Sequence, residues 1–584
     1  MKKDIKTAQE KYQKENNILN KKSDNISSLR LILFIILVVA YFSLKSLPTL
    51  KIIISLIIIT IFLIVVFYHN SIIKKIKNNN NYLNIIKEYE DRTNGNWKSF
   101  KNTGIEIDSN DLAIDIDLVG KNSLFQLINT SKSINGKRSL INKLINPKIN
   151  KNNIIENQES IKELSNNFNF ILEFQSKINS IKKIENIDYQ NYTNILDEEK
   201  HISKKELIFG IVTATLTNII LLLSIFNIIN IRYFIIALII DLIISYIYLY
   251  KYNKEFNNIS ECSRNISSLK EVYEIIINSN FKYKKLNSIK NNLTDGYEVI
   301  NKLDKISILD SYRFNFITNV ILNAIMSLNI VVLYKYNALI TKEHKIIKEN
   351  INNIEELENL ISFTTIPLIK NNTTLPVIDD KTKIEFTDIS HPLLEEDKCI
   401  TNSFDSKDDI NIITGSNMSG KTSFMKTIAI NLILMYNGSY VNASSFSSSL
   451  NKIFTSIKVT DDIEKGISTF YGELLRIQKI LEYKKDNKNP IIVFIDEIFK
   501  GTNYNDRILG AKEIIKKLSK YNCIVIITTH DFELCEIDNK KIYNYHFEEQ
   551  YIKDKITFDY KIKEGMCTKT NAKYLMEQIG ILNK

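Results

Sequence analysis

The sequence predicts an α + α/β fold, in which two apolar helical hairpins alternate with helical regions and are followed by a C-terminal α/β domain. Four long apolar runs occur in two pairs, and apolar residues recur at helical spacing between Asn257 and Leu368. From about Lys383 onward, short apolar strand-like runs alternate with helical stretches. A chain of 584 residues is too long for one compact core, so we expect several structural units.

The first pair of apolar runs covers residues 31–44 and 52–68, with a short link that contains Pro48. Each run is slightly shorter than the roughly 20 residues that span a bilayer. A buried core hairpin is therefore an alternative to the membrane hairpin that we favour. The lysine-rich polar segment before the first run argues against a cleaved signal peptide. We expect a basic cytoplasmic N-terminus over residues 1–29 and a transmembrane hairpin over residues 30–69.

The second pair covers residues 207–226 and 233–250 and predicts a transmembrane hairpin over residues 207–250. Asp241 is costly in lipid, so we expect it either to face a neighbouring helix, which we favour, or to mark a functional polar contact. Lysine is dense outside both pairs and sparse in the two links. This distribution predicts a multi-pass protein of the cell membrane whose N-terminus, middle region and C-terminal part face the cytoplasm.

Helical regions are expected over residues 70–206 and 251–375, and the second is long enough to act as a lever. Asparagine and serine interrupt the apolar run 316–334, which suits a helix packed on protein better than one in lipid. We assign that run to the soluble part. The α/β domain is expected over residues 376–584, with buried strands at residues 409–414, 491–495 and 523–528.

Charge and cysteine content exclude some classes of protein. The formal charge is +11, but much of the excess lies beside the apolar runs, where it fixes membrane orientation and does not by itself imply nucleic acid. The five cysteines are scattered without the close pairs of a zinc site or redox motif, so a reducing cytosol fits and no metal cluster is predicted.

One segment of the α/β domain carries a phosphate-binding motif. Residues 411–424 (NIITGSNMSGKTSF) pass from an apolar strand through a glycine-bounded loop into a helix and match G-x-x-x-x-G-K-[ST]. Backbone N–H groups of such a loop and the helix N-terminus face phosphate oxygens. We expect Lys421 to bind the β and γ phosphates of ATP and Thr422 to bind Mg²⁺. The expected ATP-binding residues are Gly415, Ser416, Asn417, Met418, Ser419, Gly420, Lys421, Thr422 and Ser423.

Two further strands end in side chains suited to catalysis. Residues 491–496 (IIVFID) form a buried strand that ends in Asp496 and Glu497, the pattern of a Walker B strand. Asp496 is expected to hold Mg²⁺ through water, and Glu497 to orient and deprotonate the attacking water. His530 follows the third strand at the same edge of the sheet and is expected to sense the γ-phosphate.

These motifs and the text around them resemble the MutS family of mismatch-repair ATPases. The phosphate-binding motif reads GSNMSGKT where that family typically has G-P-N-M-G-G-K-S/T. Four further segments resemble family motifs in the same order, and an upstream segment is similar to the start of the MutS core domain. The four are NGSYVNA (437–443), STFYGEL (468–474) preceded by IFTSIKVTDD (453–462), DEIFKGTN (496–503) and THDFEL (529–534), and the upstream segment is residues 123–147.

The resemblance covers about half of the chain, in two blocks separated by the second hairpin. It implies a MutS core-like lever region and an ABC-type P-loop NTPase domain. It further implies a homodimer in which Ser468 and Thr469 of one subunit approach the γ-phosphate bound by the other. The segment 391–394 (HPLL) and Asn402 resemble the family's adenine pocket, whereas Cys399 and Ile400 leave an aromatic stack on the base unsupported.

The departures from the family pattern decide between functions. We find no mismatch-reading domain and no Phe-x-Glu wedge motif, and the clamp insertion is missing or much reduced. The leading hypothesis is a membrane-anchored MutS-like ATPase that drives a dimeric switch, with DNA binding implied by resemblance alone. The alternative is an ATP-dependent regulatory switch that acts on a membrane or protein partner without DNA. A transporter ATPase is disfavoured, because STFYGEL is not an LSGGQ-type signature and four spans make a slim path.

Overall fold

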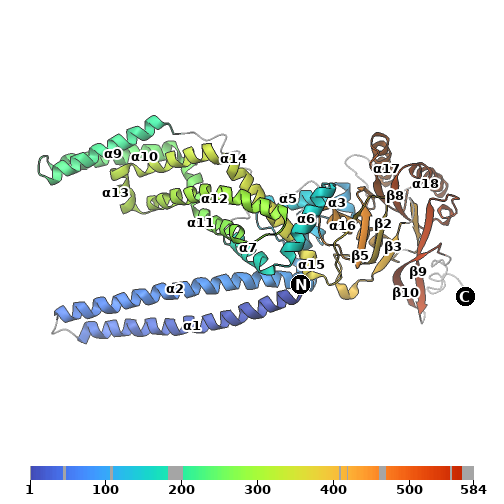
Figure 1. The fold of residues 1–584 in the computed structure, drawn as a ribbon, viewed down its shortest axis with the longest axis horizontal. Coiled ribbons are helices and arrows are strands. Elements are labelled where there is room, and N and C mark those ends of the chain that lie inside the picture. The colour runs from blue at the N-terminus through green and yellow to red at the C-terminus, as the bar shows by residue number, and fades with distance from the viewer. Residues whose placement is uncertain are drawn as a thin grey trace.

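The computed structural model describes residues 2–43, 48–104, 110–181, 202–406, 410–416, 418–459, 468–500, 502–552 and 555–567. The molecule is elongated, with a sheet-containing domain at one end and two helical prongs at the other (Figure 1). Helical segments occupy the middle and connect the two ends. The expected α/β domain is confirmed, and the rest of the described chain is helical, as expected for an α + α/β fold.

The first prong is a hairpin of two long antiparallel helices, α1 (Lys2–Ser43) and α2 (Pro48–Thr93). A helix of 46 residues is about 69 Å long, so α2 reaches from the tip of the prong into the middle of the molecule (Figure 1). There Tyr89 is buried, and Arg92 donates hydrogen bonds to Leu127 O at 2.9 Å and Asn129 O at 2.7 Å. The expected domain boundaries near residues 29 and 69 thus lie inside continuous helices.

A block of short segments follows the first prong. It consists of η1 (Asn96–Ser99), α3 (Asp111–Asp115), α4 (Leu124–Ile128), α5 (Ile134–Ile145), α6 (Lys151–Ser165) and α7 (Phe168–Ser180). Ser133 caps α5 by accepting a hydrogen bond from Gly136 N at 2.9 Å. Glu358, from a helix much later in the chain, accepts hydrogen bonds from Lys132 N at 2.8 Å and Ser133 N at 3.3 Å. This buried carboxylate joins two blocks that lie far apart in the sequence.

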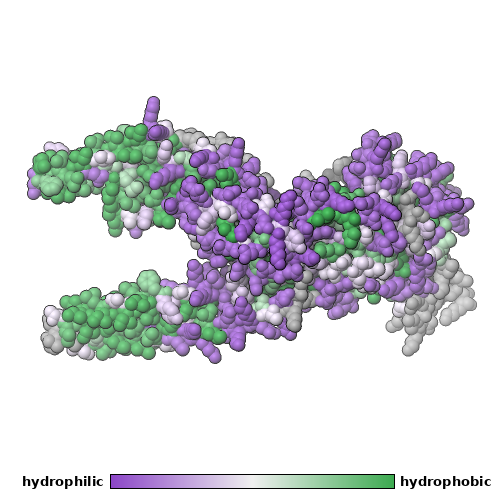
Figure 2. Space-filling view, in the orientation of Figure 1, coloured by the Kyte–Doolittle hydropathy of each residue, from purple (hydrophilic) through white to green (hydrophobic). Residues whose placement is uncertain are grey.

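The second prong is a shorter hairpin, α9 (Lys204–Ile225) and α10 (Ile231–Lys251), and α9 begins with a Ser203–Glu206 capping box. Asp241 is 5% exposed, and its Oδ2 accepts a hydrogen bond from Thr217 Oγ1 at 2.5 Å. The expectation that Asp241 faces a neighbouring helix is confirmed. Apolar side chains cover the visible outer parts of both prongs (Figure 2).

Four helices in the described part of the chain are long and apolar enough to cross a membrane: Asp4–Ser43, Thr49–Thr93, Lys204–Ile225 and Ile231–Lys251. In the first prong, no residue of the most apolar 18-residue window of either helix is buried. In the second prong, the buried share of that window is 22% in α9 and 11% in α10. The apolar runs are therefore not the interior of a packed core, which was the alternative for the first pair.

Four helices of more than ten residues and two short ones form the middle of the described molecule, as the helical spacing predicted. They are α11 (Asn253–Asn278), α12 (Lys284–Ser311), η3 (Tyr312–Phe314), α13 (Phe316–Met326), α14 (Leu328–Phe363) and α15 (Thr365–Ile369). The run 316–334, expected as one helix, is instead divided between α13 and α14. The backbone turns at Ser327, whose φ is 47°, and the two helices are bent by 78°. This positive φ cannot continue a right-handed helix.

The α/β domain contains two sheets. The order of the larger sheet is β10 (Lys555–Glu564), β9 (Ile542–Ile552), β4 (Ile410–Thr414), β8 (Cys523–Thr529), β7 (Ile491–Asp496) and β6 (Lys452–Ser456). Neighbours from β9 to β6 are parallel, whereas β10 is antiparallel to β9. The three expected strands are β4, β7 and β8. The smaller sheet has the order β1 (Val377–Asp379), β5 (Ser445–Ser449), β2 (Ile384–Ile389) and β3 (Asn402–Asp405).

Helices cover both faces of the larger sheet, which explains why its central strands are apolar throughout. On one face α16 (Lys421–Tyr436) lies between the two sheets, where Phe424 contacts rings of the smaller sheet. On the other face α17 (Thr469–Asp486) and α18 (Tyr504–Leu518) pack against Val493 and Val525. The parallel strands end at one edge, where the expected site residues follow them.

Candidate nucleotide-binding site

The phosphate loop, residues 415–420, connects β4 to α16 in the predicted strand-to-helix context. Gly415 has φ 146° and Gly420 has φ 107°, backbone conformations that favour glycine. A Cβ on Gly415 would lie 2.9 Å from the carbonyl oxygen of Phe547, so the close approach of β9 also requires glycine there. Met418 adopts φ 73° and its side chain is 83% exposed, while Asn417 lies outside the described residues.

Lys421 begins α16 and folds back over the loop. Its Nζ donates hydrogen bonds to the carbonyl oxygens of Gly415 and Ser416, both at 2.7 Å. Burial of this ammonium lowers the pKa of Lys421 to about 8. Within the described residues, Ser416 Oγ and Ser419 Oγ are buried and have no hydrogen-bond partner. Unsatisfied hydroxyls beside a buried cation fit a bound phosphate group.

Two of the expected Mg²⁺-binding residues are in contact. Thr422 Oγ1 donates a hydrogen bond to Asp496 Oδ2 at 2.9 Å, and Thr528 Oγ1 donates one to Asp496 Oδ1 at 2.5 Å. Lys500 Nζ lies 3.8 Å from Asp496 Oδ2 and 3.6 Å from Glu497 Oε2. A hydroxyl and a carboxylate that meet at a phosphate loop are hard oxygen ligands of the kind that Mg²⁺ prefers, so these residues fit the ion.

The two expected catalytic residues also lie together. His530 Nε2 is 3.0 Å from Glu497 Oε1, and Glu497 N donates a hydrogen bond to Thr528 O at 3.1 Å. The hydrogen bond from His530, together with Lys500 and Lys421, lowers the pKa of Glu497 to about 2. The carboxylate is therefore ionised at neutral pH and can orient a water molecule as a hydrogen-bond acceptor. Glu497 has φ 54°, a costly conformation for a residue with a side chain, held here beside the reacting position.

Helix α17 begins with the STFYGEL segment and is called the signature helix below. It contacts the loop after β7 in the same chain. Glu473 is buried and its Oε2 accepts a hydrogen bond from Phe499 N at 2.5 Å. The rings of Phe470 and Phe499 lie 5.5 Å apart between centroids. Ser468 caps this helix by accepting a hydrogen bond from Tyr471 N at 3.4 Å. The structure thus connects the signature helix to the Walker B strand.

Beside the phosphate loop lies a cavity of about 480 Å³. The described residues that line it include Lys421, Thr422, Glu497, His391, Leu394, Cys399, Ile400, Phe547 and Tyr560. Neither Ser468 nor Thr469 is among these lining residues, so the structure does not bring them to this cavity within one chain. A cavity of this volume beside a phosphate loop is large enough for a small ligand such as a nucleotide.

Tyr560 is the site residue that sequence reasoning missed. Its ring lies next to the phosphate loop, because a Cβ on Gly420 would be 3.2 Å from Tyr560 Cδ1. Asn402 fixes this part of β10 by donating a hydrogen bond to Tyr560 O and accepting one from Ile562 N, both at 2.9 Å. Tyr560 thus adds an aromatic ring to the cavity that is also lined by Cys399 and Ile400. No sequence motif marks Tyr560, so only the fold reveals it.

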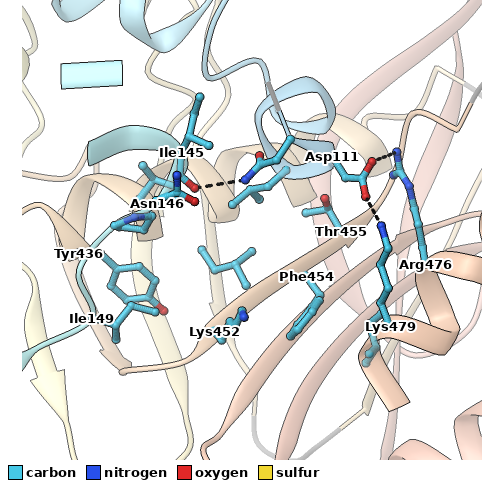
Figure 3. Close-up of a pocket in the computed structure, with 16 residues that line it drawn as sticks. Asp111, Ile145, Asn146, Ile149, Tyr436, Lys452, Phe454, Thr455, Arg476 and Lys479 are labelled. Atoms are coloured by element: carbon cyan, nitrogen blue, oxygen red, sulfur yellow. Dashed lines mark hydrogen bonds and ion pairs between the residues drawn. The ribbon is translucent and has the colours of Figure 1, made fainter. Parts of the chain in front are cut away.

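The block of short segments from η1 to α7, called the N-terminal block below, also contacts the signature helix. A second cavity of about 550 Å³ lies at this boundary (Figure 3). Arg476 of α17 and Lys479 approach Asp111 at 3.4 Å and 3.3 Å, as the dashed lines in Figure 3 mark. One turn on, the fully buried Asp115 accepts hydrogen bonds from Arg476 Nη1 at 2.6 Å and from the backbone N–H of Lys458 at 2.9 Å. This buried pair was not expected from the sequence.

Comparison with known proteins agrees with the site geometry. The family model of MutS domain V matches residues 411–581. The C-terminal part of the chain is therefore similar to domain V of the MutS family. Over 254 residues it is 32% identical to the DNA mismatch repair protein MutS of Finegoldia magna, a match that covers 41% of this chain and 29% of that protein.

The MutS protein homolog 4 of Mus musculus and that of Homo sapiens are 32% and 33% identical to this chain over 245 residues. These matches cover 38% of this chain but only 25% and 26% of the two relatives. The chain thus matches between a quarter and a third of the length of its MutS relatives, and the matched part is the ATP-binding domain of that family.

Proposed function

We propose that this MutS-family protein is a membrane-anchored ATPase whose ATP turnover drives a dimeric conformational switch. The observation that carries the proposal is the convergence of Lys421, Thr422, Asp496, Glu497 and His530 on one edge of a parallel sheet, beside a cavity of nucleotide size. These residues follow three different strands. A buried lysine, a hydroxyl–carboxylate pair and a carboxylate–imidazole pair lie together at this edge. A purely structural role does not explain that grouping, whereas phosphate binding and catalysis do.

Each residue has a distinct role in the proposed reaction. Lys421 releases the carbonyl oxygens of Gly415 and Ser416 and pairs with the β and γ phosphates of ATP. Thr422, directly, and Asp496, through water, would hold Mg²⁺, and the bound ion would supply positive charge beside the phosphates. Glu497 accepts a proton from the attacking water, and His530 keeps this carboxylate ionised and oriented.

The dimer is proposed from the family resemblance and from the position of the signature helix. Ser468 and Thr469 begin α17 and do not line the cavity of their own chain. A second copy placed with its α17 against this cavity would bring their hydroxyl groups to the γ-phosphate. Because α17 contacts Asp115 through Arg476, such an arrangement would also connect ATP turnover to the N-terminal block.

Membrane attachment is proposed from the outer surfaces of the two prongs. Large apolar side chains of α1, α2, α9 and α10 face outward, for example Phe67 at 73% and Tyr246 at 69% exposure. A soluble protein rarely leaves contiguous apolar patches of this extent in water. The helix lengths and the lysine distribution favour a multi-pass protein of the cell membrane with a cytoplasmic ATPase domain.

The first test combines extraction and turnover. The full-length protein should stay with the membrane pellet after high-salt and carbonate washes, and its release by either wash would contradict membrane attachment.

Steady-state ATPase activity of the detergent-purified protein, with Lys421→Ala as control, is then measured alone and with homoduplex or mismatched DNA. Stimulation by DNA that falls steeply with salt would support a DNA-acting enzyme. Activity that is indifferent to DNA would restrict the switch to a membrane or protein partner.

A further inference from the structure

Helix α13 has one strongly apolar face that no described part of the chain covers. Phe316 is 82% exposed, Ile317 66%, Ile321 49% and Ile325 51%. The three isoleucines follow each other at intervals of four residues, so they lie on one side of the helix. The sequence of α13, FITNVILNAIM, contains no charged residue.

The polar side chains of the same region face inward, against the second prong. Ser245 Oγ of α10 donates a hydrogen bond to Asn323 Oδ1 at 3.2 Å and accepts one from Asn329 Nδ2 at 2.5 Å. Asn218 of α9 donates to Ile325 O at 2.9 Å, and Ser327 Oγ donates to Gly210 O at 2.6 Å. Polar contacts of this kind hold helices together in an apolar environment. Of the polar residues that favoured a soluble helix, Asn323, Ser327 and Asn329 therefore contact α9 or α10. Asn319 accepts a hydrogen bond from Asn323 Nδ2 within α13.

The position of α13 continues the apolar surface of the second prong. Figure 1 shows α13 at the ends of α12 and α14, and α13 packs against α9 and α10. Figure 2 shows hydrophobic surface over this part of the prong, continuous with that of α9 and α10. The bent pair of α13 and α14 is as apolar as a broken membrane span or a re-entrant segment.

We propose that α13 is a re-entrant membrane helix whose outer face, formed by Phe316, Ile317, Ile321 and Ile325, contacts the acyl chains of lipid. The inference rests on the proposed membrane attachment and adds a fifth membrane element to it. It differs from the expectation that the run 316–334 belongs to the soluble part. Lipid is the occupant that fits, because the uncovered face is uncharged and joins a surface already proposed to lie in the bilayer.

The consequence is a direct mechanical connection between the ATPase domain and lipid. Helix α14 has 36 residues, so it is about 54 Å long. At its C-terminal end Phe363 O accepts a hydrogen bond from Ser439 Oγ, just after α16 of the ATPase domain, at 3.0 Å. At its N-terminal end it joins α13. A displacement of the ATPase domain is therefore transmitted along α14 to a helix that lies in the membrane.

The single tryptophan of the chain permits a specific test. Trp97 is 3% exposed and lies in the N-terminal block, so the native protein supplies the baseline emission. Tryptophan is introduced on α13 as Phe316→Trp or Ile321→Trp, on the α10 span as Tyr246→Trp, and on a water-exposed face as Ile155→Trp. Each full-length variant is reconstituted into phosphatidylcholine vesicles with plain or brominated acyl chains, and its ATPase activity confirms that it is folded. Bromine quenches tryptophan that touches acyl chains, and iodide quenches tryptophan in water.

The inference expects both α13 variants to behave like Tyr246→Trp, losing most of the added emission to brominated lipid and none to iodide. Quenching by iodide alone, as expected for Ile155→Trp, would place α13 in water and overturn the inference while Tyr246→Trp still reports membrane attachment. Insensitivity of α13 to both quenchers would mean that protein covers it, which also overturns the inference. Failure of Tyr246→Trp itself to respond to brominated lipid would overturn the proposed membrane attachment.

Discussion

The two ends of the molecule expose opposite kinds of surface. At the ATPase end, the cavity is lined by buried or half-buried polar groups such as Lys421 and Glu497, whose opposite charges attract each other. At the prong end, apolar side chains such as Phe67 point outward and polar ones such as Asp241 point inward. The difference teaches that the two ends suit different surroundings, and it agrees with our proposal of a phosphate ligand at one end and lipid at the other. Helices α2 and α14 connect the two.

The largest expected effect is confined to the ATPase end. Replacing Glu497 by Gln keeps the side-chain shape but removes the proton acceptor, so turnover should fall by about 10²- to 10⁴-fold while ATP binding persists. Steady-state hydrolysis and filter binding of labelled ATP measure the two quantities. Membrane pelleting of the variant should match that of the native protein. Unchanged turnover would remove Glu497 from the reaction.

The second prediction concerns the joint between the two ends. Asp115 is fully buried and paired with Arg476, so Asp115→Ala leaves a buried guanidinium and two backbone N–H groups without their acceptor. Stability should fall by about 3–5 kcal/mol, measured by thermal unfolding in detergent. Asp111→Ala is the matched control, because Asp111 is half-exposed, and it should change stability by about 1 kcal/mol or less. Equal effects of the two substitutions would contradict the proposed joint.

A third test examines the base side of the cavity. If Tyr560 stacks on the base, Tyr560→Ala should weaken ADP binding by about 1–3 kcal/mol, while Tyr560→Phe should bind like the native protein. Isothermal titration with ADP and with pyrophosphate separates the contributions, since pyrophosphate has no base to stack. A similar loss for both ligands would show that Tyr560 only supports the loop.

The pH dependence of nucleotide binding follows from Lys421. Its pKa is lowered to about 8 by burial, so below that pH the lysine is already charged before a phosphate arrives. Above pH 8 it must take up a proton on binding, and affinity for ADP should fall about tenfold per pH unit. Titrations in two buffers with different ionisation enthalpies should show proton uptake above pH 8 and none below pH 7. Affinity that stays constant up to pH 10 would contradict this assignment.

The smallest expected effect lies at the prong end. Thr217→Val removes the hydroxyl that donates to Asp241 but keeps the side-chain shape. Hydrogen bonds between helices in a membrane average about 0.6 kcal/mol, so we expect a small loss of stability and unchanged ATPase activity. Thr215→Val is the control, since Thr215 Oγ1 donates to Ile211 O within its own helix. A large loss of ATPase activity in Thr217→Val alone would give this pair a functional role.

Much of the site was predictable because its motifs are contiguous. A phosphate loop needs glycine at positions of positive φ and a lysine at the start of the next helix, and these requirements act over about ten residues. The contacts Thr422–Asp496 and Glu497–His530 were predictable too, because parallel strands end at one edge of the sheet. Tyr560 was not, since it approaches Gly420 only through the pairing of β9 with β4.

By itself the sequence determined the types of segment along the chain, namely the apolar runs, the long helices, the parallel strands and the motifs at their ends. These features depend on local periodicity and backbone requirements. Tertiary structure alone decided the pairing of Asp115 with Arg476, which lie 361 residues apart, and the break at Ser327 that turns α13 outward. Such contacts depend on how distant elements pack, because a polar side chain is satisfied by whichever partner the fold brings to it.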